Sequence, residues 1–264
     1  EFYEMTHELD PSRFFLDTCS RGEFDRRSVD LDVQHMSYFY PWGHSYNMFE
    51  NPQNWIISGS ASGIPMIVKD AGEAENWKIA RKVPSRRPVL AHEICHYAGL
   101  RDLDSLEKKF DKFCPESKPW WIGELKKLIA LKGFSKSEYD LMKKASDRFQ
   151  LLAWKLGLEA ARRSKILSGF HFLQFCDTDR YENSNGIVDC FDDKKGIDEV
   201  QFRKFNGDTV LLADMPRRVF FEGEKLLIPV IVSHFSAELS GVMTFRFTLQ
   251  DAKGSPVLSG EFPN

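Results

Sequence analysis

The sequence lacks the features that direct a protein to a membrane or to nucleic acid. No apolar run approaches the roughly 20 residues needed to span a bilayer, and lysine and arginine form no long basic stripe. The net charge is −3, so a polyanion would gain no overall attraction. The first residues, EFYE, do not have the character of a signal peptide. We therefore expect neither a membrane nor a nucleic-acid partner.

Paired cysteines are also missing. The five cysteines are odd in number and scattered, and they contain no CxxC pair. This pattern argues against a disulfide framework and against a thiolate zinc site, and it predicts buried free thiols. The five positions are Cys19, Cys95, Cys114, Cys176 and Cys190.

Aromatic residues, by contrast, are plentiful. The chain has 22 Phe, 6 Trp and 7 Tyr in an otherwise ordinary globular composition, with 42% hydrophobic and 28% charged residues. We expect most of these rings to fill a core, which leaves a few to stack on sugar rings.

In the first two-thirds of the chain, short apolar segments alternate with helical stretches. Such alternation predicts βα units and a parallel sheet. A long helical insert is expected over residues 103–166, broken at Pro115, Pro119 and around Gly133. Its last piece repeats apolar residues at the helical period and should cover the sheet. The candidate strands are 13–19, 29–36, 64–68, 88–92 and 169–176.

The character of the sequence changes after Met215. Residues 225–232 and 241–250 alternate apolar and polar side chains, which is typical of antiparallel strands. We therefore predict a first domain over 1–215 and the start of an immunoglobulin-like β-sandwich over 216–264. Only three or four strands fit before Asn264, so this sandwich is expected to be truncated.

The segment 87–102, RPVLAHEICHYAGLRD, permits two incompatible interpretations. It contains H-E-x-x-H, and on a helix His92 and His96 would share a face and bind zinc. Glu93 would then polarise a water, and Asp102 would be the third ligand. Alternatively, residues 88–92 form a buried parallel strand, and Glu93 stands at its carboxyl end, where barrel enzymes place catalytic groups.

Five segments, in order, resemble the catalytic domain of glycoside hydrolase family 2, and the resemblance spans residues 8 to about 205. A zinc protease predicts none of them, and no convincing Met-turn follows His96. The segments are ELDPSR (8–13), DVQHMSY (32–38), PVLAHEICHY (88–97), SGFHF (168–172), and NGIVD with KKG (185–189 and 194–196).

The resemblance implies a (β/α)8 barrel of class α/β, of which residues 1–215 would carry strands five to eight. It also implies a retaining double displacement on a β-linked carbohydrate, without a cofactor. Glu93 would be the nucleophile, held ionised by a hydrogen bond from Tyr38. The acid/base Glu of the family's Asn-Glu pair would lie before residue 1, so the expected partner is a missing N-terminal part of the same protein.

Further residues are expected to bind the sugar, and Phe172 stands where the family has a tryptophan. Glu73 is a rival nucleophile because it follows the apolar run 64–68. The resemblance suggests a secreted or periplasmic enzyme. Two alternatives stay open, namely a zinc protease through 92–102 and a non-catalytic carbohydrate-binding relative. The candidate substrate-binding residues are His35, Trp42, His92, Phe172, Gln174 and Asp177.

Overall fold

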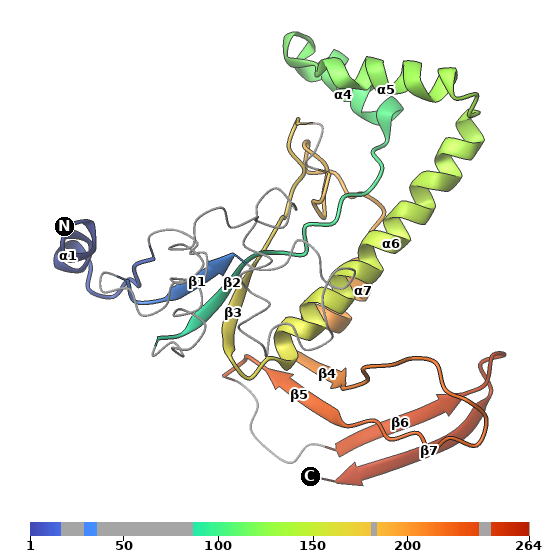
Figure 1. Ribbon diagram of the computed structural model, residues 1–264. Coiled ribbons are helices and arrows are strands. Elements are labelled where there is room, and N and C mark those ends of the chain that lie inside the picture. Colours follow the sequence, from blue (N-terminus) through green and yellow to red (C-terminus); the bar gives the residue numbers. More distant parts are fainter. Residues whose placement is uncertain (17–28, 36–86, 181–183, 238–243, 264) are drawn as a thin grey trace, which may run out of the picture. The chain divides into compact units, whose positions relative to one another are not determined.

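The computed structural model describes residues 1–16, 29–35, 87–180, 184–237 and 244–263 (Figure 1). The chain divides into two compact units, Glu1–Ser233 and His234–Asn264. The predicted strand 64–68 and residues 17–19 of the predicted strand 13–19 lie outside the described residues. Residues 13–16 are described and form no strand.

A parallel sheet lies at the centre of the first unit. Its strands are β1 (Asp32–His35), β2 (Val89–Ile94) and β3 (Leu167–Phe172), in the order β1-β2-β3. Both pairings are parallel, and β2 occupies the middle. The predicted α/β class with parallel strands is confirmed, whereas the described residues close no barrel.

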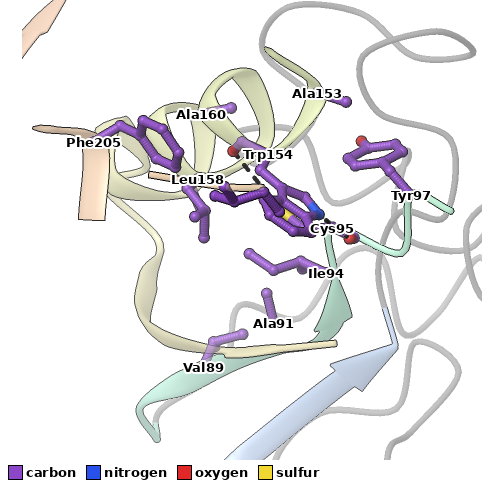
Figure 2. Packing of buried hydrophobic residues seen from close by; sticks show 12 residues of the cluster. Val89, Ala91, Ile94, Cys95, Tyr97, Ala153, Trp154, Leu158, Ala160 and Phe205 are labelled. Carbon is purple, nitrogen blue, oxygen red and sulfur yellow. Dashed lines mark hydrogen bonds between the residues drawn. The ribbon is translucent and has the colours of Figure 1, made fainter. Parts of the chain in front are cut away.

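One face of this sheet is covered by the long helix α6 (Lys136–Arg163) (Figure 1). The helix begins at Ser135, whose hydroxyl accepts from the Glu138 amide while the Glu138 carboxylate accepts from the Ser135 amide, a reciprocal cap. Trp154 and Leu158 are fully buried against β2 and β3 (Figure 2). Each such side chain contributes about 1.5–3 kcal/mol through burial. This packing fixes which face of β2 points away from α6.

The region before α6 is helical, in agreement with the apolar pattern. It contains α4 (Leu103–Phe113), the short 3₁₀ helix η2 (Pro115–Ser117) and α5 (Trp120–Leu131). The interruptions fall at the two prolines and at Gly133, whose φ of 75° suits glycine. A second small core holds these helices together, formed by Leu103, Leu106, Phe110, Trp121 and Ile122.

The rest of the chain is built from a helix and antiparallel strands. α7 (Glu199–Asn206) is followed by β4 (Thr209–Ala213), which pairs with β5 (Val230–His234). In the second unit, β6 (Thr244–Gln250) and β7 (Pro256–Pro263) form an antiparallel hairpin. The predicted strands 225–232 and 241–250 overlap β5 and β6; β5 begins five residues later than predicted, and residues 241–243 lie outside the described residues. In the described residues β4 pairs with β5 and β6 pairs with β7, so each pair forms a two-stranded sheet.

The prediction of buried thiols holds for one cysteine and fails for another. Cys95 is buried beneath α6, whereas Cys176 is exposed. Cys114 and Cys190 are half-buried, and Cys19 lies outside the described residues. The four described cysteines are free thiols.

An N-terminal helix, α1 (Phe2–Leu9), was not predicted from the sequence. It is joined to the residues before β1 through the carboxylate of Asp30. That carboxylate accepts from the Phe15 amide at 2.7 Å, from His7 Nε2 at 2.8 Å and from the Tyr3 hydroxyl at 3.1 Å. The Phe15 amide, followed by the His7 and Tyr3 donors, holds the pKa of Asp30 below its usual value.

Acidification is expected to loosen α1. The pKa of Asp30 is lower in the folded protein than in the unfolded chain. Its contribution to stability is therefore complete above about pH 4, the pKa of an aspartate in the unfolded chain, and is lost as the pH falls through the pKa in the folded protein. The protection factors of the α1 amides, which are the intrinsic exchange rates divided by the observed ones, should therefore fall at low pH by roughly fivefold, the equivalent of one hydrogen bond. The Asp30→Asn variant should show the lower protection factors at all pH values. Equal pH dependence in both proteins would contradict the assignment.

Candidate active site at the carboxyl end of the parallel sheet

The central strand β2 carries an extra residue at its carboxyl end. In the register, Ala91 pairs with Phe170 and Ile94 with Phe172, so His92 and Glu93 together lie opposite the single residue His171. This is a β-bulge, in which two residues on one strand face one on its partner. Bulges re-aim side chains and are frequent beside active sites.

The bulge explains how the faces of β2 are used. Ala91 and Ile94 are three residues apart, yet both are buried in the core beneath α6 (Figure 2). In a regular strand, two residues that are three apart point to opposite faces. The extra residue of the bulge brings Ile94 back to the same face as Ala91. Phe170 and Phe172 pack against the same core. The face away from α6 therefore carries the residues between them.

Two histidines meet on that opposite face. The rings of His92 and His171 are 5.5 Å apart in an edge-to-face arrangement. Leu90 and Gly169 lie two residues before the two histidines and pair with each other. A Cβ built on Gly169 would lie 2.9 Å from Leu90 Cδ2, so these two positions also belong to the face away from α6. His171 was not predicted as a site residue. Its position between two phenylalanines of the strand, one on either side, was the signal that it points away from the core.

The backbone around the bulge is held in an uncommon conformation. Glu93 has a φ of 53° and Cys95 a φ of 68°, both in the left-handed region. Residues other than glycine pay of order 1–3 kcal/mol there, and such positions cluster at functional sites. Glu93 is half-buried, and its negative charge acts on the imidazole of His96.

Burial favours the neutral form of two imidazoles, those of His96 and His171. Desolvation lowers the pKa of His96, and the charge of Glu93 opposes this shift. Desolvation also lowers the pKa of His171, with a smaller lowering from His92. Neutral imidazoles both donate and accept hydrogen bonds, which suits the recognition of hydroxyl groups.

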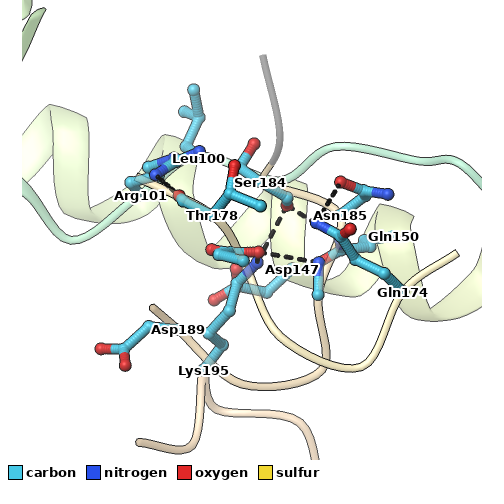
Figure 3. A network of polar contacts seen from close by, with 12 residues as sticks. Leu100, Arg101, Asp147, Gln150, Gln174, Thr178, Ser184, Asn185, Asp189 and Lys195 are labelled. Atoms are coloured by element: carbon cyan, nitrogen blue, oxygen red, sulfur yellow. Dashed lines mark hydrogen bonds and ion pairs between the residues drawn. The ribbon is translucent and has the colours of Figure 1, made fainter. Parts of the chain in front are cut away.

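A second feature, a buried ion pair, lies in the loop that follows β3 (Figure 3). Lys195 Nζ donates to Asp177 Oδ1 at 2.9 Å and to the Ser184 carbonyl at 2.9 Å. The exposed fractions of the Lys195 and Asp177 side chains are only 6% and 2%. Desolvation raises the pKa of Asp177 and lowers that of Lys195, while their mutual attraction opposes both shifts.

The loop around this pair is closed by a glycine. The Gly186 amide donates to Asp177 Oδ1 at 2.7 Å. A Cβ at Gly186 would lie 2.3 Å from the Asp177 nitrogen and 2.7 Å from the Val188 carbonyl oxygen, so no larger residue fits. Asn185 also takes part, accepting from Gln174 Nε2 at 3.3 Å and donating to the Leu173 carbonyl at 3.2 Å. The NGIVD and KKG segments thus build one loop.

Asp177 and Lys195 also line a cavity of about 940 Å³. Charged side chains of both signs surround it, and most acids are already paired. Lys109 binds Asp189 and Asp193, and Lys143 binds Asp147. The charges in this cavity therefore largely neutralise one another.

The structure brings some of the predicted site residues together and separates others. His92 and Glu93 lie at the end of β2, and His35 pairs with His92 in the register of β1 and β2. Gln174 and Asp177 belong to the loop after β3. Tyr38, Trp42 and the rival Glu73 lie outside the described residues, as does the side chain of His35.

Phe172 is placed differently from the expectation that it lines a sugar pocket. Its ring lies 5.4 Å from Trp154 and 5.8 Å from Phe202, so it packs on the face beneath α6. The strand alternation on either side of His171 explains this placement. Two further residues with important contacts, Lys195 and Gln150, were not predicted; the KKG segment was a signal for the first, and no motif marks the second.

The metal-site interpretation of 92–102 required a helix. Residues up to Ile94 instead lie in β2, and Cys95 forms a turn. In the described part of the chain, no three His, Cys, Asp or Glu side chains are grouped to hold a metal ion. Asp102 caps α4, accepting from the Ser105 amide at 3.0 Å. Each helix within those same segments is too short or too polar to cross a bilayer.

Comparison of the sequence with protein-family models and with curated proteins finds no match.

Proposed function

We propose that the protein is a glycoside hydrolase that acts on a β-linked carbohydrate by a retaining double displacement. The observation that carries the proposal is the bulge at His92 and Glu93, at the carboxyl end of the central parallel strand. Catalytic groups of barrel enzymes occupy the carboxyl ends of their strands. The order of β1, β2 and β3 also agrees with three consecutive strands of such a barrel.

In this proposal the Glu93 carboxylate attacks the anomeric carbon, and the bond to the leaving oxygen breaks. A second carboxyl group, about 5 Å from the first, protonates the leaving group and then activates water. A part of the polypeptide that precedes residue 1 would supply it, as the resemblance implies. His92 and His171, whose rings meet on the same face of the sheet, would bind sugar hydroxyls, and Tyr38 would orient Glu93.

The test is to trap the covalent intermediate. Activated fluorosugars, which are dinitrophenyl β-glycosides with fluorine in place of the second hydroxyl, slow both chemical steps but leave the first feasible. Dinitrophenolate departs as an anion without protonation, so the test does not depend on the acid/base residue. We expect mass spectrometry to find one sugar per chain, on the peptide that contains Glu93, for one or more of the gluco, galacto and manno probes.

The control is Glu93→Gln, which keeps the size of the side chain and removes the nucleophile. This variant should form no adduct. If the sugar is found on another carboxylate, such as Glu73, that residue and not Glu93 is the nucleophile. Sugar binding without any adduct would instead favour a non-catalytic carbohydrate-binding protein.

A further inference from the structure

The segment that follows Glu93 runs along α6 and is fastened to it by side chains of one helical face. The Trp154 indole donates to the Cys95 carbonyl at 3.1 Å (Figure 2). Gln150 Nε2 donates to the Tyr97 carbonyl at 2.6 Å. These two bonds fix the first residues after the bulge.

The same face continues toward the start of the helix. The Leu100 amide donates to Ser146 Oγ at 2.8 Å, and the Tyr139 hydroxyl donates to the Arg101 carbonyl at 2.9 Å. The four helix residues are separated by four, four and seven positions, which is one or two helical turns each time. They therefore lie in one stripe along α6. The order is antiparallel, because later residues of the segment meet earlier residues of α6.

The dimensions of the two elements agree. Residues 139–154 of a helix extend over roughly 22 Å at 1.5 Å per residue. Residues 95–101, if extended, cover roughly 20 Å at about 3.3 Å per residue. The two lengths are similar, so side chains of α6 reach backbone groups from one end of the segment to the other.

Gln150 is the central member of this stripe. Its side chain is fully buried, and its amide also donates to the Ser184 carbonyl at 3.2 Å, in the loop after β3 (Figure 3). The Gly99 amide donates to the same Ser184 carbonyl at 3.0 Å. Gln150 thus joins the exit of β2 to the exit of β3, the two strands that carry Glu93 and His171.

We infer that α6 is a positioning element for Glu93, and that Gln150 and Trp154 are positioning residues that hold the left-handed turn after β2 in place. This inference rests on the proposed function for its catalytic consequence. Loss of the Gln150 amide leaves the Tyr97 carbonyl without this donor and removes one of the two links to the Ser184 carbonyl, the Gly99 amide being the other. The carboxylate then samples orientations in which attack is misdirected, and a displacement of about 1 Å can cost 100-fold in rate.

The experiment compares Gln150→Met with the wild-type chain. Methionine matches the volume of glutamine and is tolerated in cores, so the fold should persist. With the fluorosugar probe, we expect the maximal inactivation rate to fall about tenfold to 100-fold with little change in probe affinity. The matched control is Leu152→Ala, a partly exposed residue of the same helix that makes no bond to the segment; neither parameter should change.

A second measurement does not depend on catalysis. Cys95 is buried beside Gly157, and its sulfhydryl faces the Trp154 carbonyl at 3.9 Å. Alkylation of the folded chain, mapped by mass spectrometry, should be faster at Cys95 in Gln150→Met than in wild type or Leu152→Ala. Exposed Cys176 provides the internal reference.

The outcomes separate the two proposals. An unchanged inactivation rate in Gln150→Met, in a chain whose wild type is labelled at Glu93, would overturn the positioning role alone. A wild type that forms no adduct would overturn the proposed function and with it the catalytic consequence. In that case the Cys95 measurement decides whether α6 holds the segment, and equal alkylation in all three proteins would refute that too.

Discussion

Glu93→Ala is expected to lose hydrolysis of an activated aryl β-glycoside by roughly 10⁴-fold or more, the scale of removing a covalent nucleophile. The bulge presents the carboxylate at the end of β2, and alanine leaves nothing there to form the glycosyl intermediate. Alanine at this position has the same left-handed φ as glutamate, so the backbone penalty is unchanged. The measurement is the rate of dinitrophenolate release in the first turnover, a step that does not depend on the acid/base residue.

Added azide should restore part of the lost rate in Glu93→Ala. A small anion can enter the space left by the carboxylate and attack the anomeric carbon from the same side. The product would be a glycosyl azide of inverted, α configuration, which magnetic resonance identifies. Glu73→Ala is the comparison variant, because Glu73 is the rival nucleophile in the sequence. If Glu93→Ala keeps full activity and Glu73→Ala loses it, Glu73 is the nucleophile and the assignment to Glu93 is wrong.

Lys195→Met is expected to destabilise the protein by about 3–5 kcal/mol, because it leaves Asp177 buried without its cation. The aspartate side chain is only 2% exposed in the native loop. Asp177→Asn should also destabilise, since the Lys195 ammonium then loses its counter-charge. The double variant should be more stable than the sum of the single effects predicts, and urea denaturation of all four proteins measures the difference.

The loss of stability caused by Lys195→Met should become smaller as the pH falls. Desolvation already raises the pKa of Asp177, and removing Lys195 takes away the attraction that opposes the shift. A folded pKa above the unfolded one favours the fold at low pH and disfavours it as pH rises through the folded value. Lys194→Met, at the exposed neighbour, should change stability by less than about 0.5 kcal/mol. Equal effects of the two lysines would show that the pair is not structurally important.

The sequence predicted those elements whose local pattern agrees with their final environment. The helical insert was visible because its apolar spacing, its prolines and Gly133 all act locally. The strand that leads into Glu93 was visible because an apolar run after Pro88 suits a buried strand. The choice between strand and helix for His92 to His96 needed the rest of the chain, because the local pattern fits both.

Other features depend on contacts between distant residues and left no local signal. The bulge is defined by the register of β2 against β3, which lie on either side of the whole insert. The role of Gln150 depends on the Tyr97 and Ser184 carbonyls, and any sequence can supply those. Phe172 was assigned to the sugar pocket by analogy with a tryptophan, whereas its burial is set by which face of β3 meets α6.

The dihedral angle at position 93 bears on why an acid is found there. If folding alone determined the amino acid, glycine would be the cheapest choice, with asparagine or aspartate next, since these tolerate a positive φ at small cost. Glutamate offers no such local advantage, and its longer side chain does not cap its own backbone in the way that the shorter ones do. The turn therefore does not explain the identity of this residue, which leaves a role for its carboxylate, as in the proposed function, to account for it.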